Sequence, residues 1–144
     1  DKIDIIASDH APHTIEEKNN KYLSCPSGGP MIQHTILSLL QKCKKYGVSY
    51  EKIVEKIAHN PATIFKVNKR GFLREGYYAD IVLIDTNTPT HVTEESLLYK
   101  CGWSPFEGQK FDNSIYKTIL NGNVVYEDGK VNSIPYGKKI TFNR

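Results

Sequence analysis

The chain has 144 residues, of which 39% are hydrophobic and 24% are charged, and its formal net charge is +3. This length allows one ordinary domain with a hydrophobic core, although the hydrophobic fraction is slightly low for a self-contained domain. Basic residues occur in pairs and never in a run, which argues against a nucleic-acid partner. No stretch of about 18 apolar residues occurs, so the sequence predicts no membrane partner either.

The three cysteines, Cys25, Cys43 and Cys101, are an odd number and lie far apart, and no Cys-x-x-Cys pair occurs. This spacing argues against a structural zinc site. The simplest expectation is a reduced, cytoplasmic protein. No signal peptide is expected. It opens almost directly on an apolar segment, from which we expect that further sequence precedes it.

The first segment of interest runs from an apolar stretch into a polar loop. Residues 2–8 are rich in isoleucine and predict a buried strand. The chain turns polar at Asp9, and Pro12 disfavours helix at the residue before it. A long loop is therefore expected over 9–30, and its second half, 24–30, is dense in turn-forming residues. Loops of this length in a compact enzyme are usually functional or disordered.

Two helices and a short third one are expected next. Apolar residues at helical spacing predict a helix over 31–46, which starts directly after a proline and stops at Gly47. A second helix is expected over 50–58, with Ser49 as its N-cap. The sequence at 59–65 predicts a break, followed by a short third helix with a proline in its first turn.

The second half of the chain reads as β-rich. Residues 80–85 predict a strong strand. Residues 86–114 are irregular, with a helical turn expected near 93–98. A hairpin is expected from the apolar runs 115–120 and 124–127, because an Asn-Gly pair lies between them.

Asp9, His10 and His13 are the candidate catalytic side chains. Asp9 falls at the predicted carboxyl end of a buried strand, where α/β enzymes place their chemistry. A carboxylate there can bind a metal and accept a proton, but aspartate also commonly caps turns. The two histidines lie three residues apart on a loop, and this spacing alone leaves metal ligand, substrate donor and surface residue all open. Gly28 and Gly29 permit close approach of a ligand.

Three segments together resemble one enzyme family. Ser-Asp-His-Ala-Pro-His-Thr at 8–14, followed by Glu-Glu-Lys at 16–18, closely resembles the signature of dihydroorotases, in the cyclic amidohydrolase superfamily. The sequence at 100–108 resembles a later segment of the same family. The His-Asn-Pro-Ala at 59–62 and the pattern over 71–82 are similar to many amidohydrolases. The resemblance covers nearly the whole chain, which is similar only to the C-terminal third of these longer proteins.

The resemblance implies an α/β fold, namely the C-terminal fragment of a metal-dependent (β/α)8 TIM barrel plus part of a small β-rich flanking domain. Residues 1–70 would provide the eighth and last barrel strand, the active-site loop and the helices that follow. Residues 71–144 would form the C-terminal part of the small, β-sandwich-like domain. Asp9 would then lie at the carboxyl mouth of the barrel, in agreement with its predicted place at the end of a strand.

The activity implied by the resemblance is zinc-dependent, reversible hydrolysis of dihydroorotate to N-carbamoyl-aspartate in pyrimidine biosynthesis. Asp9 would contact the zinc and carry a proton from the attacking water to the leaving amide nitrogen. His13 would bind the substrate carboxylate, and the loop that holds Ser27 and Gly28 would contact the pyrimidine ring through its backbone. His10 has no catalytic role in this scheme, and hydrogen bonding within the loop is expected of it.

Most of the implied zinc site cannot be placed in this chain. The family uses one or two zinc ions, held by a His-x-His pair, a carboxylated lysine and two further histidines. His34, His59 and His91 fall on a predicted helix face, a helix end and the edge of the β-rich half, so we expect structural or surface roles for them. The expected partners are the small-molecule substrate, the N-terminal remainder of the same protein and further copies of it in a homo-oligomer. The chain alone is expected to be inactive.

Two alternatives stay open. A related cyclic amidohydrolase, a hydantoinase or allantoinase, would share the pattern over 71–85. The Asp-His-Ala-Pro-His at 9–13 and the Trp-Ser-Pro-Phe-Glu-Gly at 103–108 favour dihydroorotase over this reading. The other alternative is a non-catalytic dihydroorotase-like subunit that scaffolds a partner enzyme of pyrimidine synthesis. The presence of Asp9 and His13 argues against such a subunit.

Overall fold

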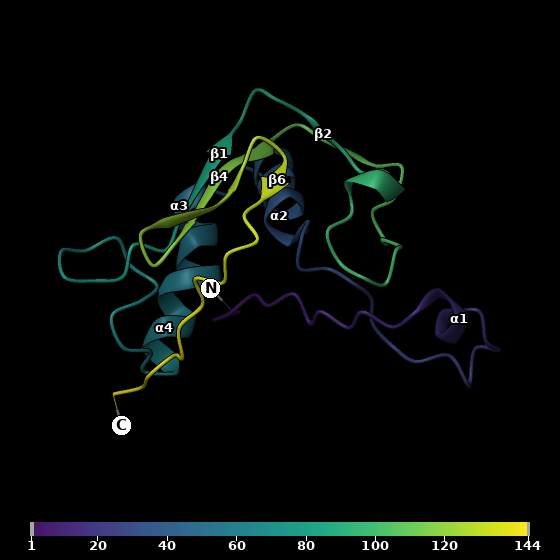
Figure 1. Ribbon diagram of the computed structural model, residues 1–144, viewed down its shortest axis with the longest axis horizontal. Helices are drawn as coiled ribbons and strands as arrows, with labels where there is room; N and C mark the ends of the chain where they lie inside the picture. Colours follow the sequence, from purple (N-terminus) through teal and green to yellow (C-terminus); the bar gives the residue numbers. More distant parts are fainter. Residues whose placement is uncertain (1, 144) are drawn as a thin grey trace.

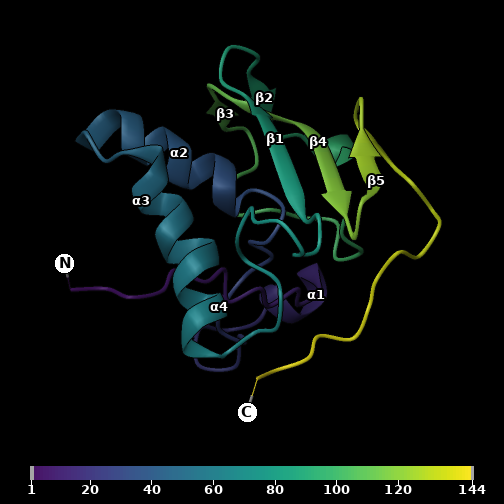
Figure 2. The same ribbon diagram turned by 90° about the vertical axis from the view of Figure 1, so that its left-hand side faces the viewer.

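The computed structural model describes residues 2–143 and has mixed helix and sheet content, in agreement with the sequence. Three consecutive helices lie beside an antiparallel sheet, while the short helix α1 (Ile15–Lys18) sits apart on a long loop (Figures 1 and 2). The larger helices are α2 (Thr35–Tyr46), α3 (Tyr50–Val54) and α4 (Asn60–Ile64), with the π-helical turn η1 (Glu55–His59) between the last two. Among the described residues, no helix has the length and apolarity needed to cross a membrane.

Helix α2 begins later and ends where the sequence predicts. The expected start at Met31 is wrong, because residues 32–34 form a turn and His34, at φ −111° and ψ 0°, is not yet helical. The backbone N–H of Thr35 donates to the carbonyl of Met31 at 3.0 Å and closes this turn, and the helix then starts with the bond from Ser38 to the His34 carbonyl at 3.0 Å. Gly47 ends it with φ 66°, a left-handed conformation that glycine adopts without strain.

Helices α3, η1 and α4 form one continuous helical segment, although the sequence predicts a break at 59–65. The Ser49 side chain caps α3 by accepting from the backbone of Lys52 at 3.3 Å, as predicted. At the end of the wide turn η1, the N–H of Asn60 bonds to the carbonyl of Glu55, five residues earlier, and the next residue, Pro61, has no N–H to donate to Lys56. The Lys56 carbonyl instead accepts from the N–H of Ile6 at 3.2 Å. The proline therefore leaves an acceptor that anchors the start of the chain.

The expected strand over residues 2–8 has no strand ladder. The segment is extended, but among the described residues its backbone bonds only to the Lys56 carbonyl and to the Asn60 side chain, which donates to the Asp4 carbonyl at 2.8 Å. Ile3 is exposed, so this segment is not buried as predicted. A strand needs a neighbour to complete its hydrogen bonds, and no described strand lies beside this one.

The sheet confirms the predicted strand and hairpin. Its order is β1-β4-β5-β6, and all its pairs are antiparallel. Asn121 and Gly122, at φ 52° and 82°, form the turn between β4 and β5, as expected for an Asn-Gly hairpin. The strands are β1 (Ile81–Asp85), β4 (Ser114–Leu120), β5 (Asn123–Glu127) and β6 (Lys130–Val131), with a separate ribbon of β2 (Thr90–His91) and β3 (Lys110–Phe111) and the 3-10 turn η2 (Glu94–Ser96).

The core lies between α2 and the β2–β3 ribbon. Leu37, Val92 and Phe111 are its buried centre. Partly buried side chains from α2, from the segment 97–106 and from β4 pack around this centre. The core therefore joins the helical half of the chain to the β-rich half.

A polar cluster fixes the β4–β5 turn to the linker that follows α4. The Arg70 guanidinium pairs with Asp80 and donates to the Asn121 side chain at 2.7 Å, while it stacks on Tyr78 at 4.2 Å. The backbone N–H of Asn121 donates to Asp80 at 2.8 Å. The Arg70 side chain is only 11% exposed, so this ion pair is largely shielded from water.

Replacing Arg70 should destabilise the fold far more than removing a surface cation. In Arg70→Met, the Asp80 carboxylate keeps its partly shielded position without its ion partner, and we expect the free energy of unfolding to fall by about 2 kcal/mol. The matched control is Lys44→Met, whose pair with Asp112 is exposed, and it should cost less than about 0.5 kcal/mol. Urea unfolding measures both, and equal costs would contradict the prediction.

Candidate functional site

Asp9 sits in a backbone conformation that few residues adopt. Its φ is 45°, in the left-handed region, where aspartate is tolerated better than most side chains. The side chain is exposed, and no hydrogen bond or ion pair engages its carboxylate among residues 2–143. Unusual backbone angles concentrate at functional sites. Asp9 is thus a free carboxylate on a conformationally special residue.

The two ends of the long loop lie side by side. His10 and Gly29 form a parallel bridge, and the N–H of Ala11 donates to the Gly29 carbonyl at 3.0 Å. Gly28 has φ 86°, and a Cβ placed on it would lie 2.8 Å from the Cβ of Ala11. Only glycine permits this approach. The structure therefore brings Asp9 and His13 into one region with the Gly-Pro segment.

His10 has a structural role, as expected. Its Nδ1 accepts from the backbone N–H groups of Met31 and Ile32, at 3.1 and 3.3 Å. Because Nδ1 accepts, the ring proton is on Nε2, and Nδ1 is not free to bind a metal or substrate. The ring also lies 5.7 Å from the ring of Tyr99. His10 ties the start of the loop to the turn before α2.

His13 is held at three points. Its N–H donates to the Ala11 carbonyl at 2.9 Å, and its carbonyl accepts from Nε1 of Trp103 at 2.7 Å. Its ring Nδ1 lies 3.3 Å from Oε2 of Glu17. Among the described residues, only Nδ1 of the two ring nitrogens has such a partner. Nε2 is therefore available for a further hydrogen bond.

Lys18 and Trp103 are contributors that the sequence did not single out. The Lys18 ammonium donates to the carbonyls of Pro26 at 2.7 Å and Gly28 at 3.0 Å. It also lies 5.8 Å from the centre of the Trp103 ring. The Glu-Glu-Lys sequence after the histidines was the available signal for Lys18. Trp103 lies in the segment 100–108 that resembles the family, and its indole N–H reaches the loop itself at the His13 carbonyl.

Other histidines and Ser27 do not join this arrangement. His34 is buried beside Phe111, and His59 stacks on Phe72 with ring centres 4.5 Å apart. His91 is exposed on β2. These positions confirm the structural or surface roles expected for them. Ser27 is exposed beside Gly28 and forms no hydrogen bond to the described residues, so its predicted substrate contact stays a prediction.

The described residues do not by themselves make a metal site. Within the range 2–143, no three His, Cys, Asp or Glu side chains come together as metal ligands. Asp9 can supply one carboxylate oxygen, and His10 is excluded by its hydrogen bonds. A zinc ion at Asp9 would therefore need its other ligands from outside this part of the protein.

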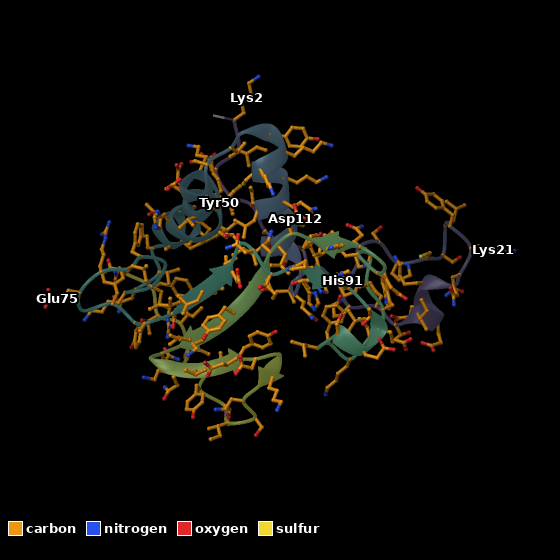
Figure 3. The ribbon with its side chains drawn as sticks, turned by 90° about the horizontal axis from the view of Figure 1, so that it is seen from above. Lys2, Lys21, Tyr50, Glu75, His91 and Asp112 are labelled. Atoms are coloured by element: carbon orange, nitrogen blue, oxygen red, sulfur yellow. The ribbon has the colours of Figure 1, made fainter. Side chains whose placement is uncertain are left out.

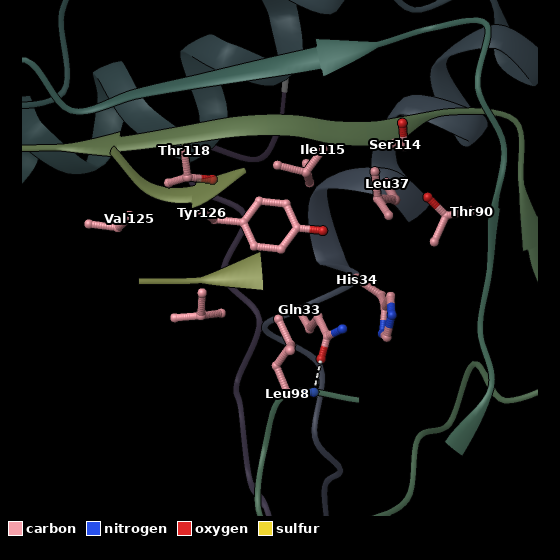
Figure 4. Close-up of a pocket in the computed structure, with 11 residues that line it drawn as sticks. Gln33, His34, Leu37, Thr90, Leu98, Ser114, Ile115, Thr118, Val125 and Tyr126 are labelled. Atoms are coloured by element: carbon pink, nitrogen blue, oxygen red, sulfur yellow. Dashed lines mark hydrogen bonds between the residues drawn. The ribbon is translucent and has the colours of Figure 1, made fainter. Parts of the chain in front are cut away.

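A separate cavity of about 350 Å³ lies between α2 and the sheet (Figure 4). The Gln33 side chain is fixed at its edge by bonds to the backbone of Ser96 and Leu98, each 2.8 Å. His34 also lines the cavity, and its Nδ1 has no partner among the described residues. Burial lowers the pKa of His34 below its ordinary value. None of the lining residues belongs to the loop 9–30. The first of them, Gln33, follows shortly after that loop.

The chain is similar in sequence to proteins of known family. The sequence profile described as the amidohydrolase family matches residues 1–125. The chain belongs to the amidohydrolase family. It is 37% identical to a dihydroorotase of Pyrococcus horikoshii over 96% of this chain and 32% of that protein. It is 42% identical to a dihydroorotase of Endomicrobium trichonymphae over 87% of this chain and 30% of that protein.

Solved structures of other amidohydrolases share the fold. A D-hydantoinase matches with a TM-score of 0.80 and 23% identity, over 89% of this chain and 29% of that one. The L-hydantoinase of Arthrobacter aurescens matches with a TM-score of 0.75 and 27% identity, over 90% and 30%. The chain thus spans about a third of the length of the relatives it matches. These matches cover both the helices and the sheet, so both parts of the chain belong to the shared fold.

Gly28→Ala should loosen the contact between the two loop ends. The left-handed φ alone costs a residue with a Cβ about 1–2 kcal/mol, and the new methyl group meets Ala11. We expect the Ala11 amide, which donates across this contact, to exchange its hydrogen at least about tenfold faster. The double variant with Ala11→Gly removes the clash and should recover part of the protection. No change in exchange would contradict the prediction.

His34 should make stability depend on pH in a defined direction. Its pKa in the folded chain is lowered from 6.5 by burial, so below pH 6.5 the unfolded chain binds a proton that the folded chain does not. The free energy of unfolding should therefore be at its full value above pH 6.5 and fall as the pH drops below it. Urea unfolding between about pH 5 and 8 measures this. His34→Phe should lose that part of the dependence, and an unchanged profile would refute the assignment.

Proposed function

We propose that the full-length protein is a dihydroorotase, to which this chain contributes the proton shuttle and part of the substrate clamp. The observation that carries the proposal is the loop itself, in which the free Asp9 carboxylate and His13, whose backbone is held by Trp103, lie on the segment that pairs with Gly29. The similarity to dihydroorotases over most of the chain supports the same activity.

The proposed reaction adds water to the ring amide of dihydroorotate and breaks the C–N bond to give N-carbamoyl-aspartate. Asp9 accepts a proton from the attacking water and delivers it to the amide nitrogen as that bond breaks. His13 binds the substrate carboxylate through Nε2, and the backbone near Ser27 and Gly28 contacts the ring. Zinc, when bound, supplies Lewis-acid polarisation of the amide carbonyl, and Asp9 is the residue of this chain that would hold it.

The rest of the site is proposed to come from the N-terminal remainder of the protein. The extended segment 2–8 would be the eighth strand of a TIM barrel, and residues 71–144 would belong to a small flanking domain. Two observations support this. The backbone of 2–8 forms few bonds among the described residues, and many large apolar side chains are exposed, among them Ile64, Phe65, Val82 and Val131. We also propose a homo-oligomer, and a cytoplasmic location where the cysteines stay reduced, in line with the free thiols of all three.

Hydantoinase activity is the second candidate, because the matched solved structures are hydantoinases. Sequence identity favours dihydroorotase, at 37% against 27% and 23%. A non-catalytic subunit that scaffolds a partner enzyme is the third candidate. The presence of both Asp9 and His13 in the loop weighs against it.

Turnover by the full-length protein tests the proposal. Dihydroorotate should be hydrolysed, and hydantoin and allantoin should be turned over much more slowly. Asp9→Asn removes the proton acceptor with little change in shape, so kcat should fall by about 10²–10⁴-fold with a similar KM. The matched control is Asp112→Asn, an exposed aspartate in a surface ion pair, which should leave kcat unchanged. Preference for hydantoin, or full activity in Asp9→Asn, would overturn the proposal.

A further inference from the structure

Helix α1 is a single helical turn with no buried residue, yet its side chains contact both halves of the loop. Its Lys18 holds the carbonyls of Pro26 and Gly28. Its Glu17 contacts the ring of His13, in the first half of the loop. Figure 3 shows that Lys21, just beyond this helix, lies at one extremity of the molecule. With no buried residue of its own, this helix depends on such polar contacts, which also include bonds from the Asn20 and Cys25 side chains to its carbonyls.

The Glu17 carboxylate is exposed, yet two contacts fix the position of one of its oxygens. Its Oε2 accepts from the backbone N–H of Thr14 at 2.9 Å, and its own N–H donates to the Thr14 hydroxyl at 3.3 Å. These reciprocal bonds form a capping box. The same Oε2 lies 3.3 Å from Nδ1 of His13. The cap therefore fixes the position of the oxygen that meets the imidazole.

The His13 backbone is fixed independently of Glu17. Ala11 accepts from its N–H, and Trp103 donates to its carbonyl. With the backbone anchored on both sides, the ring retains rotation about its side-chain torsions. The contact at Nδ1 is the one polar restraint on that rotation among the described residues. When Nδ1–H donates to Glu17, the ring orientation is set and Nε2 is presented outward.

We propose that Glu17 is a positioning residue that orients the His13 imidazole toward the carboxylate of the substrate. This inference rests on the proposed function, because it assigns the residue that prepares His13 for its ligand. Glu17 does not touch the substrate in this scheme. It fixes the ring tautomer and direction, so its loss should weaken substrate binding while the chemistry at Asp9 proceeds.

Steady-state kinetics of the full-length enzyme separates positioning from helix capping. Glu17→Ala should raise KM for dihydroorotate about tenfold with kcat within about threefold, and Glu17→Gln, which keeps an acceptor oxygen, should restore most of the affinity. Thr14→Ala weakens the capping box but leaves the Glu17 acceptor and its backbone donor. It should lower the thermal midpoint without raising KM. Glu16→Ala removes a neighbouring carboxylate and should match the parent enzyme.

Two results would overturn the inference. One is an unchanged KM in Glu17→Ala, and the other is an equal rise in KM in Thr14→Ala and Glu17→Ala, which would assign the effect to the helix cap. A parent enzyme that does not turn over dihydroorotate would refute the proposed function instead. In that case, a crystal structure of full-length Glu17→Ala decides the point. A turned His13 ring supports positioning, and a ring that keeps its orientation refutes it.

Discussion

The close approach of Ala11 to Gly28 and Gly29 is the constraint on which the candidate site depends. A Cβ at Gly28 would overlap the Ala11 methyl group, and a Cβ at Gly29 would lie 3.3 Å from the Trp103 ring. Because neither glycine carries a side chain, one end of the loop can donate a backbone hydrogen bond to the other. The same approach brings the Gly28 carbonyl within reach of Lys18. The side-chain bonds of Lys18 thus depend on the backbone contact between the two loop ends.

A second constraint connects this loop to the helices. The N–H of Ile6 reaches the Lys56 carbonyl because Pro61 cannot occupy that acceptor. At the far end of the loop, His10 accepts from the first backbone groups after Pro30, so α2 and the loop share a boundary. The segment that carries Asp9 is therefore attached to the helical half before and after the catalytic candidate. Neither bond involves the backbone of Asp9 itself, whose φ of 45° lies in the left-handed region.

Local chemistry decided which elements could be predicted from the sequence. The Asn121–Gly122 turn, the Gly47 helix end and the Ser49 cap were predictable, because each depends on a few neighbouring residues. The helix start at Met31 was wrong, because the turn before α2 depends on long-range packing around His34. The segment 2–8 is extended as expected, but it has no ladder because no described strand lies beside it. Lys18 could not be placed for a similar reason, since its carbonyl partners lie on the other side of the loop. The Glu17–His13 pair is local, but it depends on the one-turn helix α1, which the sequence did not predict.

His10 and His13 show how hydrogen bonding separates residues that a sequence leaves equivalent. Both lie on one short loop segment, but backbone donors occupy Nδ1 of His10, whereas a carboxylate faces Nδ1 of His13. An imidazole that accepts backbone bonds is committed to the fold, while one whose proton faces a carboxylate keeps its other nitrogen available. Hydantoinases share the architecture of this chain at a TM-score of 0.80, so the fold alone does not choose a substrate. In the proposed function, that choice comes from His13 and the Gly28 backbone, which would contact the substrate ring and its carboxylate.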